Sequence, residues 1–391
     1  MAELVDASGT VHWVGAGLST GLGLREVCDR AGRVVLWSRR VERAAGVLAR
    51  LGLTGRAEAR AYDRWALPAD LGPGDVVVSM VPAAEHAPLL RACVDRRAHF
   101  ACSSYVSADL LAEAPAAASA GLVVLTEAGL DPGIDHLYAH ALVDRARTAL
   151  GEMAATADFT SYCGGLPAVP NEFRYRFSWA PRGVLGALRA PARYVAEGAE
   201  RVADRPWEAT RAVTLAGETF EAYPNRDSLP FVEQYGLPPS WRLRTFVRGT
   251  LRLEGWREAW APVFAAVETG DDDRIAALAD DLAARYPTTD ADRDRVVLAV
   301  ALRVRGDRVR GDGDGPTWSG AWLLDIVGDD ADSAMARCVS LPLAVGVAGI
   351  LAGDTAPGLH RAAEDAATVG RWLDFLAAHG VAARLTEGHR D

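Results

Sequence analysis

The feature that most constrains the fold is a regular alternation of apolar runs and helix-like segments between residues 10 and 126. Asp75–Val81 reads DVVVSMV, a continuous apolar run that is typical of a strand buried on both faces of a parallel sheet. Shorter strands are predicted at Val11–Val14 and Arg33–Trp37, each followed by a helical segment. A further helix is predicted over Ser107–Ala120, with Ser107 as its cap. Strands and helices that alternate at this spacing predict a doubly wound α/β domain.

The pattern changes after about Asp131, where a helix is predicted over Ile134–Leu150. Strand-like segments then dominate, and Val296–Val304 with Thr317–Val327 is predicted to form an antiparallel pair. This favours a second α/β domain with a largely antiparallel sheet. Two helices, Ser333–Leu351 and Ala362–His379, are expected to close the chain, one of them packing back on the first domain. The expected domains are 1–131, 132–345 and 346–391.

A glycine-rich turn follows the first predicted strand, where a dinucleotide-binding fold places its phosphate loop. Gly15 suits a tight turn, and Gly17 lets backbone amides approach a pyrophosphate at the start of a helix predicted over Leu18–Ala31. The third glycine is late, because Thr20 occupies its usual position. A purely structural turn is the alternative reading. The predicted cofactor residues of this turn are Gly15, Ala16, Gly17, Leu18 and Ser19.

The second predicted strand ends in Ser38, Arg39 and Arg40, where NAD-binding folds usually carry an acidic residue. A hydroxyl beside two guanidinium groups suits a 2′-phosphate, so the sequence favours NADP(H). Val81 and Pro82 follow the third buried strand and are expected along the nicotinamide side, although Pro82 could simply start the next helix.

Composition excludes several kinds of chemistry. All 42 basic side chains are arginine, so no lysine can form an imine, act as a general base or hold a phosphate. A net charge of −10 without a basic run argues against binding to nucleic acids or anionic membranes. The run Leu341–Gly353 is too short to span a bilayer, and the N-terminus has no signal-peptide pattern. Five cysteines without a CxxC pair fit a reducing cytoplasm, and no metal-ligand spacing is visible.

Several longer motifs are more specific than a fold requires. They are SSY at 103–105, EAGLDPGIDH at 127–136, SYCGGLP at 161–167, YRFSWAPRGV at 175–184, PNRDS at 224–228 and RGTLR at 248–252. Together they resemble the saccharopine reductase family, the NADP-dependent, glutamate-forming saccharopine dehydrogenases. The resemblance implies a Rossmann domain, an α/β substrate domain and a homodimer. It also implies that 2-aminoadipate 6-semialdehyde condenses with L-glutamate and that NADPH reduces the imine to saccharopine.

The same resemblance implies that Tyr105, Asp131, Cys163 and Arg226 contact the substrate. Asp131 could orient the ammonium group or handle its proton, Tyr105 could donate a hydrogen bond, and Cys163 is either a small contact residue or an inert thiol. The other expected site residues, taken from the same motifs, are Ser103 for the cofactor and Ser104, Gly133, Asn225, Arg248 and Thr250 for the substrate.

Because the substrate carries several carboxylates, Arg226, Arg248 and Arg252 are interpreted as bidentate clamps, although any of them could be a surface ion-pair arginine. Asp135 and His136 suggest an acid/base pair, but they could equally cap and pack the helix that they begin.

The segment Ala168–Tyr175 is shorter than the acidic and amide-containing stretch common in the family, which leaves the amine and aldehyde open. One alternative is a relative that makes another secondary amine, such as a carboxylated polyamine or an opine-like product. A second alternative is a non-catalytic NADP-binding sensor. The absence of lysine argues against the lysine-forming saccharopine dehydrogenases, which use lysine and histidine for proton transfer.

Overall fold

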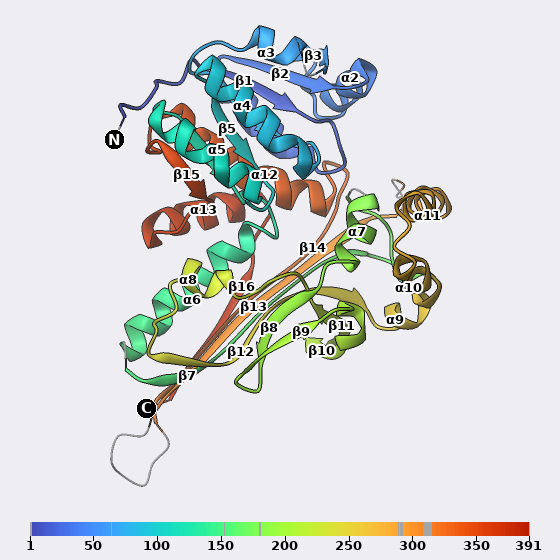
Figure 1. The fold of residues 1–391 in the computed structure, drawn as a ribbon, viewed down its shortest axis with the longest axis vertical. Coiled ribbons are helices and arrows are strands. Elements are labelled where there is room, and N and C mark those ends of the chain that lie inside the picture. Colours follow the sequence, from blue (N-terminus) through green and yellow to red (C-terminus); the bar gives the residue numbers. More distant parts are fainter. Residues whose placement is uncertain are drawn as a thin grey trace. The chain divides into compact units, whose positions relative to one another are not determined.

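The computed structural model describes residues 2–63, 65–151, 153–179, 181–287, 289, 292–307 and 315–390, and the chain divides into two compact units (Figure 1). Unit 1 contains residues 1–136, 331–364 and 371–380. Unit 2 contains residues 137–330, 365–370 and 381–391. Unit 1 is therefore assembled from segments near both ends of the sequence.

Unit 1 is built on a parallel sheet that has seven strands within the described residues, in the order β15-β6-β5-β4-β1-β2-β3 (Figure 1). The strands are β1 (Thr10–Val14), β2 (Arg33–Ser38), β3 (Glu58–Ala61), β4 (Val76–Ser79), β5 (His99–Cys102), β6 (Val123–Thr126) and β15 (Gly358–Arg361). Strand β4 reads VVVS and is buried throughout, because helices cover both faces of the sheet. The predicted doubly wound domain is confirmed.

The helices of unit 1 pack against its parallel sheet. They are α1 (Leu22–Cys28), α2 (Val41–Arg50), α3 (Ala66–Asp70), α4 (His86–Arg96), α5 (Ala108–Ser119) and α12 (Ala334–Leu351), with a 3₁₀ turn at Ala83–Glu85. Leu67, Leu90 and Leu110, from α3, α4 and α5, pack on Val77 and Phe100 in one core. Ser107 caps α5 as predicted, since its hydroxyl accepts a hydrogen bond from the Leu110 amide at 3.2 Å.

Helix α12 joins unit 1 by packing closely on α1. A Cβ at Gly23 would lie only 1.9 Å from the Ser340 carbonyl oxygen, so the two backbones approach at a glycine. The 18 residues of α12 are long and apolar enough to cross a membrane by length and composition, but 72% of them are buried inside the protein. This burial is the behaviour of a core helix.

Unit 2 is built on a mixed sheet whose main path, within the described residues, runs β10-β11-β12-β7-β13-β14-β16. Its strands are β7 (Ala155–Pro167), β8 (Ala192–Ala196), β9 (Ala199–Ala203), β10 (Arg211–Leu215), β11 (Glu218–Pro224), β12 (Trp241–Leu253), β13 (Asp294–Gly306), β14 (Thr317–Val327) and β16 (Arg384–Arg390). Strands β7 and β12 pair in parallel, and the other neighbours on this path are antiparallel. The predicted antiparallel pair β13–β14 is confirmed.

The smaller helices of unit 2 enclose an aromatic core. They are α7 (Pro181–Leu188), α8 (Pro230–Gln234), α9 (Trp256–Ala259), α10 (Ala261–Glu268) and α11 (Asp272–Arg285), with a 3₁₀ turn at Pro206–Ala209. Trp256 and Trp260 are fully buried, and Trp260 stacks on Phe173 with ring centroids 4.9 Å apart. Helices α6 (Ile134–Leu150) and α13 (Ala366–Ala378) each contribute residues to both units.

Several expected boundaries are wrong. The first helix begins at Leu22 rather than Leu18, and the chain ends in strand β16 rather than in a helix. Strand β15 and the polar edge strand β3 have no counterpart in the predicted pattern, nor does the hairpin β8–β9. These strands are short or polar, and their partners lie far away in sequence or on an exposed edge, so alternation alone could not reveal them.

Candidate functional site

The glycine loop between β1 and α1 presents a row of free backbone amides. Gly15 has a φ of +120°, and a Cβ there would lie 2.8 Å from the Met80 carbonyl oxygen, so only glycine fits. No heavy atom lies within 4 Å of a Cβ built on Gly17. The amides of residues 16–19 donate no hydrogen bond to any described residue. Consecutive unpartnered amides at an exposed turn fit the phosphates of a dinucleotide.

The start of helix α1, in contrast, is already occupied by protein groups. The Leu22 amide donates to Asp332 Oδ2 at 2.7 Å, and the Gly23 amide donates to Ser340 Oγ at 2.9 Å. Asp332 also pairs with Arg50 at 3.1 Å, and its burial raises the pKa of this carboxyl. The loop therefore extends to Gly21, which explains the late start of the helix. The amides available to a phosphate belong to the loop rather than to the first helical turn.

Two exposed arginines, Arg39 and Arg40, follow strand β2, which pairs with the strand that leads into the glycine loop. Arg39 and Arg40 are exposed, and within the described residues neither guanidinium forms an ion pair or hydrogen bond. Ser38 is the last residue of β2 and is half-buried. A hydroxyl and two unpartnered guanidinium groups at this position fit a 2′-phosphate.

The predicted nicotinamide-side residues lie at the ends of neighbouring strands. Val81 and Pro82 follow β4, and Ser103 follows β5, which pairs with β4. The Ser103 hydroxyl lies 3.8 Å from the sulfur of Met80. The ends of these parallel strands form the edge at which open α/β sheets bind ligands.

Tyr105 and Asp131, two of the predicted catalytic residues, are in direct contact at this edge. The Tyr105 hydroxyl donates to Asp131 Oδ1 at 2.5 Å, a length typical of a hydroxyl bonded to a carboxylate. Tyr105 comes from the segment after β5, and Asp131 from the segment after β6. The hydrogen bond fixes the orientation of the Asp131 carboxylate.

The loop that carries Asp131 is closed by two glycines. A Cβ at Gly133, where φ is +144°, would lie 2.0 Å from the Gly129 carbonyl oxygen. The Gly133 amide donates to Asp135 Oδ1 at 2.7 Å, so this predicted substrate contact is engaged within the loop. A Cβ at Gly129 would lie 2.9 Å from that of Ser103. The two segments that carry Tyr105 and Asp131 are thus packed against each other through glycine.

Ser104, a predicted substrate residue, is held by a buried histidine that sequence reasoning missed. His86 Nε2 lies 3.0 Å from Ser104 Oγ, and His86 Nδ1 lies 2.8 Å from Ser79 Oγ. Both distances are within hydrogen-bond range. Burial lowers the pKa of His86 to about 4, so the ring is neutral near neutral pH. A single histidine on an apolar helix carries no sequence pattern that could have identified it.

The low pKa of His86 predicts a specific loss of stability in acid. An unfolded histidine titrates near pH 6.5, so protons bind the unfolded state first as the pH falls from about 6.5 to about 4. Over this pH range, the free energy of unfolding of the wild type should fall by up to about 3 kcal/mol more than that of His86→Gln. Urea denaturation of both proteins at several pH values measures the difference. Parallel stability curves for the two proteins would contradict it.

In unit 2, a second group of predicted residues gathers along strand β12. Cys163 on β7 is opposite Thr250 on β12, and both belong to the face that carries Arg248. Arg248 is 4% exposed, with its guanidinium carbon 3.8 Å from the centre of the Phe231 ring. The Asn225 amide donates to the Arg248 carbonyl at 2.9 Å. The segment after β11 therefore lies beside this part of β12.

Arg226 adopts a conformation that sets it apart from its neighbours. Its φ is +56°, which is uncommon for a residue with a side chain, and the side chain is exposed. Its carbonyl accepts a hydrogen bond from the Arg193 amide at 2.9 Å. The backbone around Arg226 is thus fixed although the guanidinium reaches solvent.

Arg252, interpreted from the sequence as a carboxylate clamp, lies in an aromatic cage. Its guanidinium carbon is 4.9, 5.7 and 5.4 Å from the rings of Tyr175, Tyr223 and Trp256. It donates to Tyr223 Oη at 3.1 Å and is 6% exposed. Cation–π contacts of this kind support a structural role in the core.

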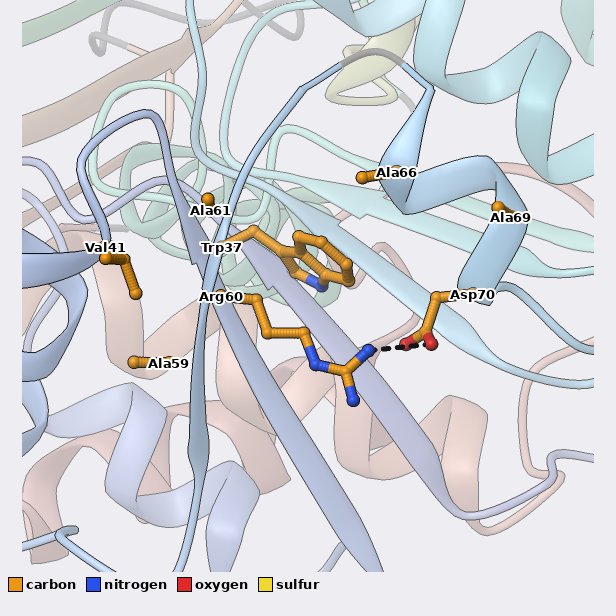
Figure 2. Close-up of a pocket in the computed structure, with 8 residues that line it drawn as sticks. All are labelled: Trp37, Val41, Ala59, Arg60, Ala61, Ala66, Ala69 and Asp70. Carbon is orange, nitrogen blue, oxygen red and sulfur yellow. Dashed lines mark hydrogen bonds and ion pairs between the residues drawn. The ribbon is translucent and has the colours of Figure 1, made fainter.

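A hollow of about 490 Å³ lies beside β3. Figure 2 shows the Trp37 indole and the Arg60–Asp70 ion pair among the residues that line it. Its lining residues are Trp37, Val41, Ala59, Arg60, Ala61, Ala66, Ala69 and Asp70. None of the predicted cofactor or substrate residues is among them. Elsewhere in the described residues, no group of three or more His, Cys, Asp or Glu side chains could hold a metal ion.

Two family models together match most of the chain. Residues 11–125 match the family model described as the saccharopine dehydrogenase NADP binding domain, and residues 129–381 match the saccharopine dehydrogenase C-terminal domain. An apo saccharopine dehydrogenase (L-Glu forming) structure from Saccharomyces cerevisiae superposes with a TM-score of 0.79 at 25% identity. That match covers 97% of this chain and 99% of the other.

Two curated relatives are named saccharopine dehydrogenase [NADP(+), L-glutamate-forming]. The protein from Pyricularia oryzae is 36% identical over 256 residues, which cover 64% of this chain and 56% of the relative. The protein from Saccharomyces cerevisiae is 35% identical over 272 residues, which cover 61% of this chain and 59% of the relative. The matched stretch therefore spans little more than half of these relatives. Because the two domain models together match most of its length, the chain belongs to the saccharopine dehydrogenase family.

Proposed function

We propose that the protein is an NADP-dependent oxidoreductase of the L-glutamate-forming saccharopine dehydrogenase type. In this reaction, 2-aminoadipate 6-semialdehyde and L-glutamate lose water to form an imine. The imine then takes up a hydride from NADPH and a proton to give saccharopine and NADP⁺. Family membership supports the reaction class, and the observation that carries the proposal is the Tyr105–Asp131 hydrogen bond at the ligand-binding edge of the parallel sheet.

The cofactor site that we propose uses the free amides of residues 16–19 for the pyrophosphate. Ser38, Arg39 and Arg40 would hold the 2′-phosphate, and Val81, Pro82 and Ser103 would border the nicotinamide. When bound, the cofactor supplies the hydride. The protein supplies orientation and charge. Asp332 and Ser340 already accept hydrogen bonds from the first amides of α1, so the loop amides are the ones that would hold the phosphates.

We assign Asp131 to the nitrogen of the substrate. Its carboxylate, oriented by the Tyr105 hydroxyl, would orient the ammonium group or exchange its proton. The substrate carries several carboxylates, for which Arg226 and Arg248 are the proposed partners. Ser104, Asn225, Thr250 and Cys163 are proposed as smaller contacts, and Gly133 acts by closing the Asp131 loop.

Turnover assays test the reaction and its alternatives. NADPH oxidation is followed with 2-aminoadipate 6-semialdehyde and either glutamate or a panel of other amines. We expect turnover with glutamate. Turnover with a diamine but not with glutamate would instead identify an enzyme that makes a carboxylated polyamine. Tight NADPH binding without oxidation of saccharopine at alkaline pH would identify a non-catalytic sensor.

Cofactor preference is tested by Arg39→Ala. Loss of a charge-assisted contact to the 2′-phosphate should raise the Kd for NADPH roughly 10- to 100-fold, whereas the Kd for NADH should change little. Fluorescence titration of both cofactors measures the two constants, with Arg30→Ala as a control because Arg30 is already paired with Glu26. Equal losses for NADPH and NADH would contradict the 2′-phosphate assignment.

We also propose that the protein is a cytoplasmic homodimer that binds neither nucleic acid nor membranes. Its five cysteines are free, which suits a reducing compartment. One face of the unit 2 sheet has a hollow of about 340 Å³ among partly exposed side chains such as Leu215 and Leu323, which supports an interface there. Sedimentation equilibrium would give the mass in solution. The functional division into residues 1–131, 132–345 and 346–391 also remains a proposal.

A further inference from the structure

Two carboxylates and one imidazole of unit 1, those of Glu127, Asp135 and His136, form a buried cluster next to the segments that carry Tyr105 and Asp131. His136 Nε2 lies 3.1 Å from Glu127 Oε2, and His136 Nδ1 lies 3.3 Å from Asp135 Oδ2. Glu127 is 3% exposed, and Asp135 and His136 are fully buried. Each ring nitrogen of His136 thus faces a carboxylate oxygen. The ring thus connects the two carboxylates as a rigid bridge.

This cluster closes the loop that carries Asp131. Glu127 stands at the beginning of the loop, and Asp135 and His136 stand at its end, where α6 begins. Asp135 Oδ1 also accepts the Gly133 amide at 2.7 Å. In the sequence, Asp131 lies midway between Glu127 and Asp135, the two residues that the His136 ring contacts. The ring therefore holds both ends of the loop.

Glu127 connects the same structure to the segment that carries Tyr105. Its Oε1 accepts the backbone amide of Val106, the residue after Tyr105, at 3.2 Å, and its own amide donates to the Ser104 carbonyl at 3.1 Å. Glu127 has a φ of +56°, a conformation that a residue with a side chain keeps only when its surroundings enforce it. One side chain thus holds Tyr105's segment and Asp131's loop together.

The charges around Glu127 fit a structural anchor. Arg361, on the neighbouring strand β15, has its Nε 3.9 Å from Glu127 Oε1. Glu364 and His360 lie in the same chain segment as Arg361 and face this region. The Glu127 carboxylate therefore faces the His136 ring with one oxygen and the Arg361 guanidinium with the other.

We propose that Glu127, acting through His136 and Asp135, is a positioning residue that fixes Tyr105 and Asp131 for proton transfer without touching the substrate. The proposal rests on the proposed function and adds residues outside the expected catalytic set. Its signature is geometric: a side chain that keeps the shape and both hydrogen bonds of Glu127 should suffice without its charge.

The test compares Glu127→Ala with Glu127→Gln. In the glutamine variant, the amide oxygen can accept from Val106 and the amide N–H can donate to a neutral His136. We expect Glu127→Ala to lower kcat at least 30-fold, with the KM for glutamate and the Kd for NADPH within about twofold of the wild type. We expect Glu127→Gln to keep kcat within about threefold of the wild type.

The matched control is His99→Gln. His99 is also buried in unit 1, and it hydrogen-bonds to the backbone of Val5 and Val123. These contacts lie at the first residues of β5 and β6, whereas the Tyr105 and Asp131 segments follow the last residues of these strands. Its substitution should lower the melting temperature without lowering kcat. If Glu127→Ala does not fold, Glu127→Asp replaces it, because the shorter side chain keeps the charge but cannot reach both partners. At least a tenfold lower kcat than in Glu127→Gln is then expected.

Hydrogen–deuterium exchange separates this inference from the proposed reaction, because it needs no turnover. Faster exchange in Glu127→Ala, confined to residues 103–107 and 127–134 and reversed in Glu127→Gln, supports the positioning role even if the wild type does not use glutamate. Two results overturn it: unchanged exchange in these segments, or faster exchange spread over the whole of unit 1. A kcat for Glu127→Gln as low as for Glu127→Ala also overturns it.

Discussion

Replacing Asp131 by asparagine should lower kcat by about 10²- to 10³-fold while leaving the fold and NADPH binding intact. The amide oxygen of asparagine can still accept the Tyr105 hydroxyl, so the local geometry is kept. What is lost is a group that can exchange a proton with the substrate nitrogen, and such groups typically contribute 10²- to 10⁴-fold. The measurement is single-turnover NADPH oxidation, which separates the chemical step from product release.

Tyr105→Phe provides the comparison for Asp131→Asn. It removes only the donated hydrogen bond, so Asp131 keeps its charge but loses its orientation, and a decrease of about tenfold in kcat is expected. If Asp131→Asn retained more than a tenth of the wild-type kcat, Asp131 would not be the group that handles the proton. A lower NADPH affinity in either variant would show that the pair contacts the cofactor instead.

Arg226 should be the most sensitive arginine for substrate binding. Arg226→Ala removes a planar double donor from a fixed backbone, so the KM for the carboxylate-bearing substrate should rise about 100-fold, equivalent to about 3 kcal/mol. Arg226→Lys should recover little of this, because an ammonium group is a point charge and cannot form the paired contact.

The control for Arg226 is an exposed arginine of the unit 2 sheet. Arg242 on β12 is paired with Asp307 at 2.8 Å, so Arg242→Ala should leave the KM unchanged. Steady-state kinetics with varied glutamate and varied aldehyde shows which substrate loses affinity. Full recovery by Arg226→Lys would mean that charge alone is recognised and that the bidentate clamp is the wrong description.

The sequence predicted the parts of the fold that are encoded locally. DVVVSMV identified β4 as a buried parallel strand because continuous apolar runs need cover on both faces. Ser107 identified the start of α5 because a capping hydroxyl acts over three residues. The motifs identified Tyr105 and Asp131, although their hydrogen bond depends on two loops after neighbouring strands and could not be read from spacing.

The features that were missed depend on partners far away in sequence. The late start of α1 is caused by Asp332, which lies 310 residues after Leu22 and accepts the hydrogen bond of the Leu22 amide. Strand β15 is recognisable only beside β6, and β16 has a polar sequence that becomes a strand through pairing with β14. Glu127 and His86 act through contacts made in three dimensions, so no local pattern distinguishes them from ordinary buried polar residues.

The capping of α1 by Asp332 and Ser340 also has a consequence for how unit 1 can fold. The start of the helix and the groups that cap it lie more than 300 residues apart in the sequence. Strand β15, which pairs with β6 at the edge of the same sheet, lies later still in the sequence. Residues 1–136 alone lack both the caps of α1 and this edge strand, so we expect that fragment to be less stable than unit 1, in which the later segments are present.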